Sequence, residues 1–82
     1  MDVIDYAILE KMAGRLQATA KLKAATRKGI KSAVEKINDK TLYRRLKKLV
    51  ENGTVAVGIK IALEHTYYVT EAGLNELKEA KK

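Results

Sequence analysis

The side chains with the clearest chemical use are long hydrogen-bond donors concentrated in one stretch of the chain. They are Lys40, Thr41, Tyr43, Arg44, Arg45, Lys47 and Lys48. Between them, Leu42, Leu46 and Leu49 recur at helical spacing, so a helix here would bury its leucines and turn the polar side chains outward. Arginine and lysine arranged in this way can donate hydrogen bonds to phosphate oxygens and to base edges. The stretch therefore predicts a surface that contacts nucleic acid.

Basic residues are concentrated in the middle of the chain. The 82 residues include 17 lysines and arginines and 10 acidic residues, a net charge of +7. Between Lys11 and Val50 there are 13 basic residues against Glu35 and Asp39, a local net charge of +11. A surface that merely keeps a protein in solution mixes both signs. A segregated basic segment instead favours a phosphate backbone or an anionic membrane surface as partner.

Length and composition exclude many other classes of protein. A chain of 82 residues is expected to form one domain, residues 1–82, around one core. The chain has no cysteine and a single histidine, His65, which excludes disulfides, zinc–thiolate sites and multi-histidine metal sites. With no catalytic triad, phosphate-cradling glycine loop or paired carboxylates, we expect no enzyme, no metal and no cofactor. No apolar run nears ~18 residues and no secretory leader is present, so we expect no membrane partner and a cytoplasmic location.

The first part of the chain, from Asp2 to about Leu16, is predicted to be a helix with two apolar stripes. One stripe consists of Ile4, Ile8 and Met12, and the other of Tyr6, Leu9, Ala13 and Leu16. Two stripes suggest that the helix faces both the core and a second subunit, and we assign Ile4, Ile8 and Met12 to a dimer interface. A helix buried deeply in a monomer is the alternative. For residues 17–25, alternation of Ala20, Leu22 and Ala24 favours a short strand, with a helix as the other possibility.

Two consecutive helices follow, joined by a tight turn. Thr26 can cap a helix over about Arg27 to Ile37, and Asn38 or Asp39 can cap a helix over about Asp39 to Asn52. Gly53 supplies the residue with positive φ that ends the second helix. This is the arrangement of a helix-turn-helix, in which the second helix enters the major groove of DNA.

Position along that second helix separates base readers from phosphate contacts. Residues near its N-terminus and one turn later reach base edges. For this role we predict Lys40, Thr41, Tyr43 and Arg44. Cations farther along the helix, on the preceding helix or on the hairpin contact phosphates, which position the protein without reading sequence. For that role we predict Arg27, Lys28, Lys31, Arg45, Lys47, Lys48 and Lys60.

From Thr54 to Thr70 the apolar period changes to two, which predicts a β-hairpin. We expect its turn near Ala62 to Glu64, although Gly58 could instead be a bulge or the turn itself. Thr70 can cap a last helix that turns Leu74 and Leu77 inward, with lysines 78, 81 and 82 at its C-terminal end. The elements together predict an α+β fold of the winged helix-turn-helix class. Such a fold has a three-helix core, a small antiparallel sheet or wing, and a short C-terminal helix.

Two sequence blocks resemble a known family. KTLYRRLKKLVENGTV and HTYYVTEAGLNEL are similar to the recognition helix, wing and closing helix of winged helix-turn-helix regulators, most of all those of the PadR type. The resemblance covers about residues 26–80. It implies a homodimer that binds duplex DNA, usually a repressor.

The sequence departs from the PadR pattern in three ways. PadR-type regulators dimerise through a long C-terminal helix, whereas 12 residues follow Thr70 here, so the first helix would take that role. The expected wing, Thr54 to Thr66, carries Lys60 and His65 as its basic residues, which makes insertion into a minor groove doubtful. A body this small also leaves no room for an effector pocket, and we expect no small-molecule ligand.

The leading hypothesis is therefore a sequence-specific, homodimeric transcriptional repressor that inserts helix 39–52 into the major groove of double-stranded DNA. The alternative is a DNA-binding protein of the plasmid-partition or chromatin type that binds repeated sites and spreads or recruits a partner. A winged helix that docks on proteins without contacting DNA is a third class, against which the basic segment argues.

Overall fold

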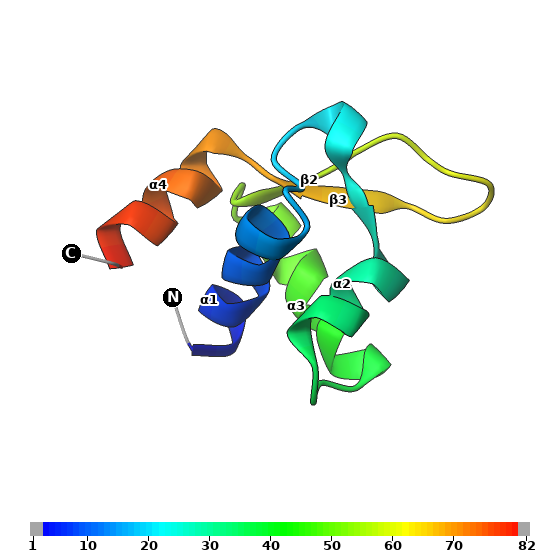
Figure 1. The fold of residues 1–82 in the computed structure, drawn as a ribbon, viewed down its shortest axis with the longest axis horizontal. Helices are drawn as coiled ribbons and strands as arrows, with labels where there is room; N and C mark the ends of the chain where they lie inside the picture. The colour runs from blue at the N-terminus through cyan, green and yellow to red at the C-terminus, as the bar shows by residue number, and fades with distance from the viewer. Residues whose placement is uncertain (1–2, 81–82) are drawn as a thin grey trace.

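The computed structural model describes residues 3–80, which form four α-helices and a three-stranded antiparallel sheet (Figure 1). The helices are α1 (Val3–Glu10), α2 (Arg27–Val34), α3 (Asp39–Glu51) and α4 (Glu71–Ala80). The strands are β1 (Ala25–Thr26), β2 (Val55–Val57) and β3 (Thr66–Val69). A π-helical turn, Lys11–Arg15, extends α1, and a 3₁₀ turn, Lys21–Lys23, precedes β1. The predicted α+β winged helix-turn-helix architecture is confirmed; Asp2, Lys81 and Lys82 lie outside the described residues.

Strand β3 is the centre of the sheet and pairs with both other strands. Its antiparallel register with β2 places Val69 opposite Val55 and Tyr67 opposite Val57. On its other edge, Tyr67 lies opposite Ala25 of β1. Because β1 runs directly into α2, this pairing ties the start of α2 to the sheet.

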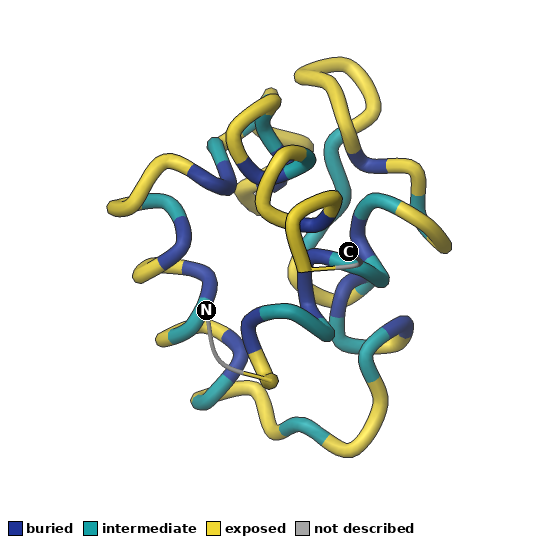
Figure 2. Tube along the Cα trace, turned by 90° about the vertical axis from the view of Figure 1, so that its left-hand side faces the viewer, coloured by how far each residue is buried: buried dark blue, intermediate teal, exposed yellow. Residues whose placement is uncertain are grey.

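The core lies between the helices and one face of the sheet. Buried side chains from every helix and from β2 and β3 meet there. Figure 2 marks the buried positions along the chain in dark blue. They include Ile8, Leu9, Met12, Ala18, Ile30, Leu42, Leu46, Leu49, Val55, Tyr67, Val69 and Leu77. The predicted inward leucines of α3 are confirmed. Of the two leucines predicted to point inward from α4, Leu77 is buried and Leu74 packs against the core from a half-buried position.

Side-chain caps start three of the helices where the sequence predicts them. The Thr26 hydroxyl accepts a hydrogen bond from the amide of Gly29 at 3.2 Å. The Asn38 side chain accepts one from the amide of Thr41 at 2.8 Å. Thr70 does the same for Gly73 at 3.1 Å, ahead of α4. Each cap satisfies a backbone donor that the helix itself cannot pair, and so sets the first residue of its helix.

Helix α2 ends three residues earlier than expected, at Val34 instead of Ile37. Both Glu35 and Lys36 adopt positive φ, 52° and 57°, which a right-handed helix cannot accommodate. The chain reverses there, and Ile37 packs half-buried against the core. The turn of the helix-turn-helix therefore starts at Glu35, and the prediction that α2 continues to Ile37 is wrong.

The strand predicted within residues 17–25 is largely absent. Gln17 has a positive φ of 52°, and the chain then forms the 3₁₀ turn, in which Leu22 is 83% exposed. The strand is confined to Ala25–Thr26. The alternation of Ala20, Leu22 and Ala24 was misleading because a 3₁₀ turn at Lys21–Lys23 interrupts the chain, although Ala20 and Ala24 on either side of it are extended. The inward apolar residue of this segment is Ala18, whose carbonyl accepts a hydrogen bond from the amide of Val69 at 2.7 Å.

The hairpin turns where predicted, but its strands are short. Strand β2 ends at Val57 and β3 begins at Thr66, and the loop of residues 58–65 between them is called the wing loop below. Ile61 and Glu64 form an isolated bridge around Ala62, which has a φ of 55° and marks the turn. Gly58 is not the turn. A Cβ atom there would lie 2.5 Å from the Cβ of Ala24, so glycine permits the close approach of the wing loop to the segment before β1.

The predicted dimer stripe on α1 needs correction. Ile8 and Met12 are fully buried in the core, whereas Ile4 is 41% exposed. Two of the three residues therefore face the interior of the protomer and cannot contact a second subunit. The helical spacing was right, but in a protein of this size both stripes of the helix are needed to fill the core.

Candidate nucleic-acid interface

Helix α3 presents a row of cations on the side opposite its buried leucines. Lys40, Arg44 and Lys47 are exposed and follow one another at intervals of four and three residues, which aligns them on one ridge of the helix. Lys48 is also exposed, on the flank of this ridge. Thr41 is half-buried, and its amide is engaged by the Asn38 cap. The structure thus brings most of the predicted base readers together on the outer side of α3.

Arg45 does not belong to this ridge. Its side chain is half-buried, and Nη1 lies 3.5 Å from Oδ1 of Asp5, a buried residue of α1. This ion pair directs Arg45 toward α1, a position that does not suit the phosphate contact predicted for it. The sequence analysis did not single out Asp5. It could have been noticed as an acidic residue between apolar neighbours in a helix that packs in the core.

The start of α2 adds cations beside α3. Arg27 and Lys28 are exposed and Lys31 is half-buried. The guanidinium carbon of Arg27 lies 5.2 Å from the centre of the Tyr43 ring, within the range of a cation–π contact. Tyr43 lies on the flank of α3 that faces α2 and the wing, and is 49% exposed.

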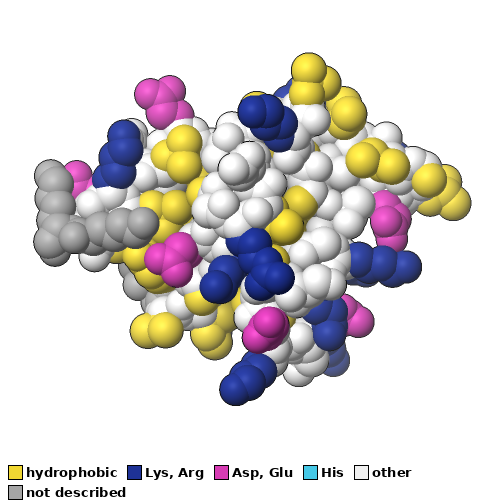
Figure 3. All heavy atoms as spheres, in the orientation of Figure 1, with side chains coloured by type: hydrophobic (Ala, Val, Ile, Leu, Met, Phe, Trp, Pro, Cys, Tyr) yellow, Lys and Arg dark blue, Asp and Glu magenta, His cyan; other side chains and the backbone are white. Residues whose placement is uncertain are grey.

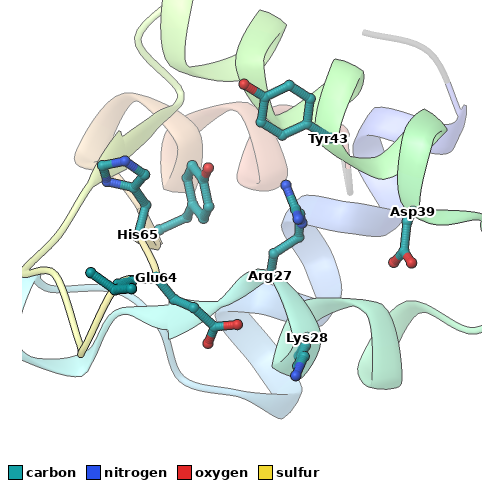
Figure 4. A pocket seen from close by; sticks show the side chains of 8 residues that line it. Arg27, Lys28, Asp39, Tyr43, Glu64 and His65 are labelled. Carbon is teal, nitrogen blue, oxygen red and sulfur yellow. The ribbon is translucent and has the colours of Figure 1, made fainter.

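A cleft of about 220 Å³ separates α2, α3 and the wing loop. Its lining residues are Arg27, Lys28, Asp39, Tyr43, Leu63, Glu64, His65 and Tyr67. In Figure 4, Arg27 extends toward the ring of Tyr43, while Lys28 and Asp39 point away from that ring. Sequence reasoning did not anticipate that Glu64, His65 and Tyr67 would join α3 here, because hairpin residues meet the helix only through the tertiary fold.

Tyr67 forms the floor of this region and stays uncharged. Burial raises the pKa of its hydroxyl above the usual 10.0; the charge of Arg27 lowers the pKa and Tyr43 raises it, both less than burial does. A tyrosine whose pKa lies above 10.0 remains protonated at neutral pH. Tyr67 therefore contributes a neutral hydroxyl to the cleft, whose negative charges come from Asp39 and Glu64.

The wing loop is apolar at its surface. Ile59 and Ile61 are about half exposed, and Leu63 is 89% exposed. Hydrophobic side chains gather along the upper right of Figure 3, over the 3₁₀ turn and the wing. Lys60, a predicted phosphate contact, is exposed on the same loop.

A second hollow, apolar and about 210 Å³ in volume, lies between α1 and the α2–α3 turn. Val3, Ile4 and Ala7 line one side, and Val34 and Ile37 line the other. Ile4, the exposed residue of the predicted dimer stripe, therefore lies in this hollow.

Two further properties concern the described part of the chain. Residues 3–80 hold no group of three histidine, cysteine, aspartate or glutamate side chains placed to bind a metal ion. No helix within the same residues has the length and hydrophobicity that a membrane span requires.

Comparison with known proteins gives two structural relatives. No protein-family model matches the chain, and no curated protein matches it either. The fold is similar to that of TubR from Bacillus megaterium pBM400, with a TM-score of 0.84, 24% identity, and coverage of 98% of this chain and 86% of that one. It is also similar to a DNA-binding TubR fragment from Clostridium botulinum, with a TM-score of 0.77 and 30% identity, over 98% of this chain and 96% of the fragment. Because the Clostridium botulinum fragment is 30% identical to this protein over nearly all of both chains, the protein belongs to the TubR family.

Proposed function

We propose that this protein binds double-stranded DNA as a homodimer of the plasmid-partition type, with α3 in the major groove. The observation that carries the proposal is the ridge of Lys40, Arg44 and Lys47, held outward by the leucines packed behind it. Cations in such a row neutralise phosphates and release counterions, which drives association with DNA. The DNA-binding TubR fragment, 30% identical, supports the same activity.

The TubR relatives support the partition hypothesis better than the repressor hypothesis. PadR-type membership stays a resemblance of the two sequence blocks, since neither structural relative is a PadR protein. A partition-type protein occupies several repeated sites, whereas a repressor dimer saturates a single operator. The number of protein copies bound per DNA therefore separates the two functions.

The residue roles are part of the proposal. On the exposed side of α3, Lys40, Thr41, Tyr43 and Arg44 would read base edges. Lys47 and Lys48 on α3, Lys28 and Lys31 on α2, and Lys60 on the wing loop would contact phosphates. Arg45 is left out because of its ion pair with Asp5.

The homodimer is also a proposal, and its interface is open to test. Of the predicted stripe, Ile4 has the exposure that a subunit contact needs, and it lies in the apolar hollow beside the α2–α3 turn. Sedimentation of Ile4→Glu against the unmodified protein tests this surface. If Ile4 is at the interface, the variant sediments as a monomer. A variant that remains a dimer would show that the interface lies elsewhere.

The decisive experiment selects bound duplexes from a random pool at moderate salt, then compares the selected duplex with a scrambled one as salt rises. We expect a selected motif whose advantage over the scrambled duplex persists at higher salt. Copies of the motif in tandem are then titrated. Cooperative filling of tandem copies supports the partition type, and independent single-site binding supports a repressor. Absence of binding at low salt would contradict the DNA-binding function itself.

A further inference from the structure

We propose that Arg27 is a positioning residue, which acts on DNA by holding the ring of Tyr43 and does not itself contact phosphate. The inference rests on the proposed function, because it assigns a role within the same DNA surface. It also revises the sequence prediction, in which Arg27 is one of several interchangeable phosphate contacts. Tyr43 becomes a pre-oriented reader at the edge of the α3 ridge.

The contact itself is the first support. The Arg27 guanidinium lies 5.2 Å from the centre of the Tyr43 ring, and in Figure 4 it extends toward that ring. Tyr43 is half exposed and lies on the flank of α3, so without a neighbour its ring could adopt several rotamers. A guanidinium over one face favours a single orientation. An ordered side chain then forms its DNA contact at a smaller cost in conformational entropy.

The anchoring of Arg27 is the second support. Arg27 is the first residue of α2 and directly follows Thr26, whose hydroxyl caps that helix. Thr26 and Ala25 pair with Thr66 and Tyr67 in the sheet. The backbone of Arg27 is therefore held by both a helix cap and a strand pairing. Tyr67, buried in the same cleft, is held by the strand on the other side of that pairing.

Arginine and lysine differ in shape, and this difference distinguishes a positioning role of Arg27 from a contact made by its charge alone. A guanidinium is planar and stacks over an aromatic ring, whereas a lysine ammonium is a compact charge on a flexible stem. Arg27→Lys keeps the positive charge but removes the planar contact. Lys28 is the matched control, because it is the adjacent exposed cation and points away from Tyr43 in Figure 4.

The test measures dissociation constants for the selected and the scrambled duplex, at several salt concentrations, with four variants. These are Arg27→Lys, Tyr43→Leu, the double variant that combines them, and Lys28→Gln. We expect Arg27→Lys to lower the preference for the selected duplex by about 2- to 5-fold, the effect of losing one exposed cation–π contact, with the salt slope unchanged. The double variant should bind no worse than Tyr43→Leu alone, because Arg27 acts through Tyr43. Lys28→Gln should weaken both duplexes equally and lower the salt slope by about one unit.

Losses that add in the double variant, or an equal loss on both duplexes for Arg27→Lys, would overturn the positioning role. The ring signals of Tyr43 in NMR spectra of the protein without DNA provide a separate readout. These signals should shift in Arg27→Lys and stay in place in Lys28→Gln. If the unmodified protein prefers neither duplex, the proposed sequence-specific function fails, and so does the role of Tyr43 in reading bases. This holds even if the ring signals of Tyr43 shift in Arg27→Lys. If preference exists but the ring signals do not respond, the inference about Arg27 alone is overturned.

Discussion

At the scale of single residues, Arg44 and Lys48 are two cations of α3 to which we assign different contacts with DNA. Arg44 lies in the middle of the α3 ridge, one turn beyond Lys40, where a helix seated in the major groove comes nearest to the bases. Lys48 lies on the flank of the ridge, where the proposed binding mode would bring it near the sugar–phosphate backbone. Arginine can also pair with guanine through two hydrogen bonds, which lysine on a flank cannot reproduce.

We expect Arg44→Ala to cost about 1 to 3 kcal/mol on the selected duplex and much less on a scrambled one. Lys48→Ala should weaken binding to both duplexes alike and reduce the salt slope by about one unit. Fluorescence anisotropy over a range of salt concentrations measures both effects. Equal losses on both duplexes for Arg44→Ala would remove its role in reading bases.

The ion pair between Asp5 and Arg45 joins α1 to α3 and is expected to serve stability. Removing the carboxylate in Asp5→Ala leaves a half-buried guanidinium without this partner, which should cost about 1 to 2 kcal/mol of unfolding free energy. Urea unfolding measures the loss, with Glu51→Ala on the exposed end of α3 as a control that should change little. An unchanged midpoint for Asp5→Ala would show that the pair contributes nothing.

At the scale of elements, the boundaries that sequence reasoning predicted well depend on neighbours a few residues apart. Thr26, Asn38 and Thr70 each cap a helix by bonding to an amide three residues later, so the signal is local. The end of α2 and the 3₁₀ turn have no such signal. Non-glycine residues adopt positive φ at Glu35 and Lys36 after α2 and at Gln17 before the 3₁₀ turn. The residues that follow, Ile37 and Ala18, pack in or against the core, and that long-range packing is invisible to local patterns.

The candidate site, too, was predictable from local spacing only in part. Helical spacing was enough to predict that Lys40 and Arg44 share an exposed side of α3. It could not distinguish Arg45, because the partner of that side chain, Asp5, is 40 positions away in the sequence and meets it only through packing. The cleft formed with the wing loop was likewise beyond the reach of periodicity, since the register of β3 decides which hairpin residues line it.

Glycine at the turn between α2 and α3 should stabilise the protein. Glu35 combines a φ of 52° with a ψ of 150°, a region that is costly for residues with a Cβ atom. Glu35→Gly relieves that cost but makes the unfolded chain more flexible, and the net gain is expected to be about 1 kcal/mol. Ser32→Gly, in the body of α2, should instead lose about 0.5 kcal/mol. Thermal unfolding compares the two; a loss for Glu35→Gly would mean that its backbone is not strained.

Gly73 allows α4 to approach the residue before the start of β2 closely. A Cβ atom at this position would lie 2.3 Å from the carbonyl oxygen of Thr54, a backbone atom that cannot move aside freely. Gly73→Ala should therefore cost about 1 to 3 kcal/mol of stability. Gly29→Ala provides the contrast, because its Cβ atom meets the Thr26 hydroxyl at an ordinary 3.5 Å, and alanine in a helix is favoured by about 0.5 to 1 kcal/mol. Opposite signs in urea unfolding would confirm the packing argument, and a neutral Gly73→Ala would contradict it.

At the scale of the whole molecule, the separation of charge decides how binding responds to salt. The segment from Lys11 to Val50 has a net charge of +11, whereas the remaining residues sum to −4. The cations available to a polyanion are therefore mostly those of this segment, which includes α2 and most of α3. Each phosphate contact adds to the salt dependence of binding, so the salt slope counts the contacts.

We expect the slope of log K against log salt to be about −4 to −5 for one protomer and about −9 for a dimer, from roughly five phosphate contacts each. Titrations of a scrambled duplex between low and moderate salt give this number directly. A slope near the single-protomer value at protein concentrations where sedimentation shows a dimer would mean that half of the proposed contacts do not form.

The apolar wing loop has a practical consequence for anyone who handles the protein. The net charge of +7 makes the molecules repel one another at low salt, and added salt screens that repulsion. Ile61 and Leu63 remain exposed whatever the salt. Excluded anions such as sulfate strengthen the association of apolar surfaces, so ammonium sulfate should precipitate this protein at unusually low concentration. Sodium chloride is thus the better salt for stripping nucleic acid during purification, and a small amount of mild detergent should extend the storage life of the pure protein.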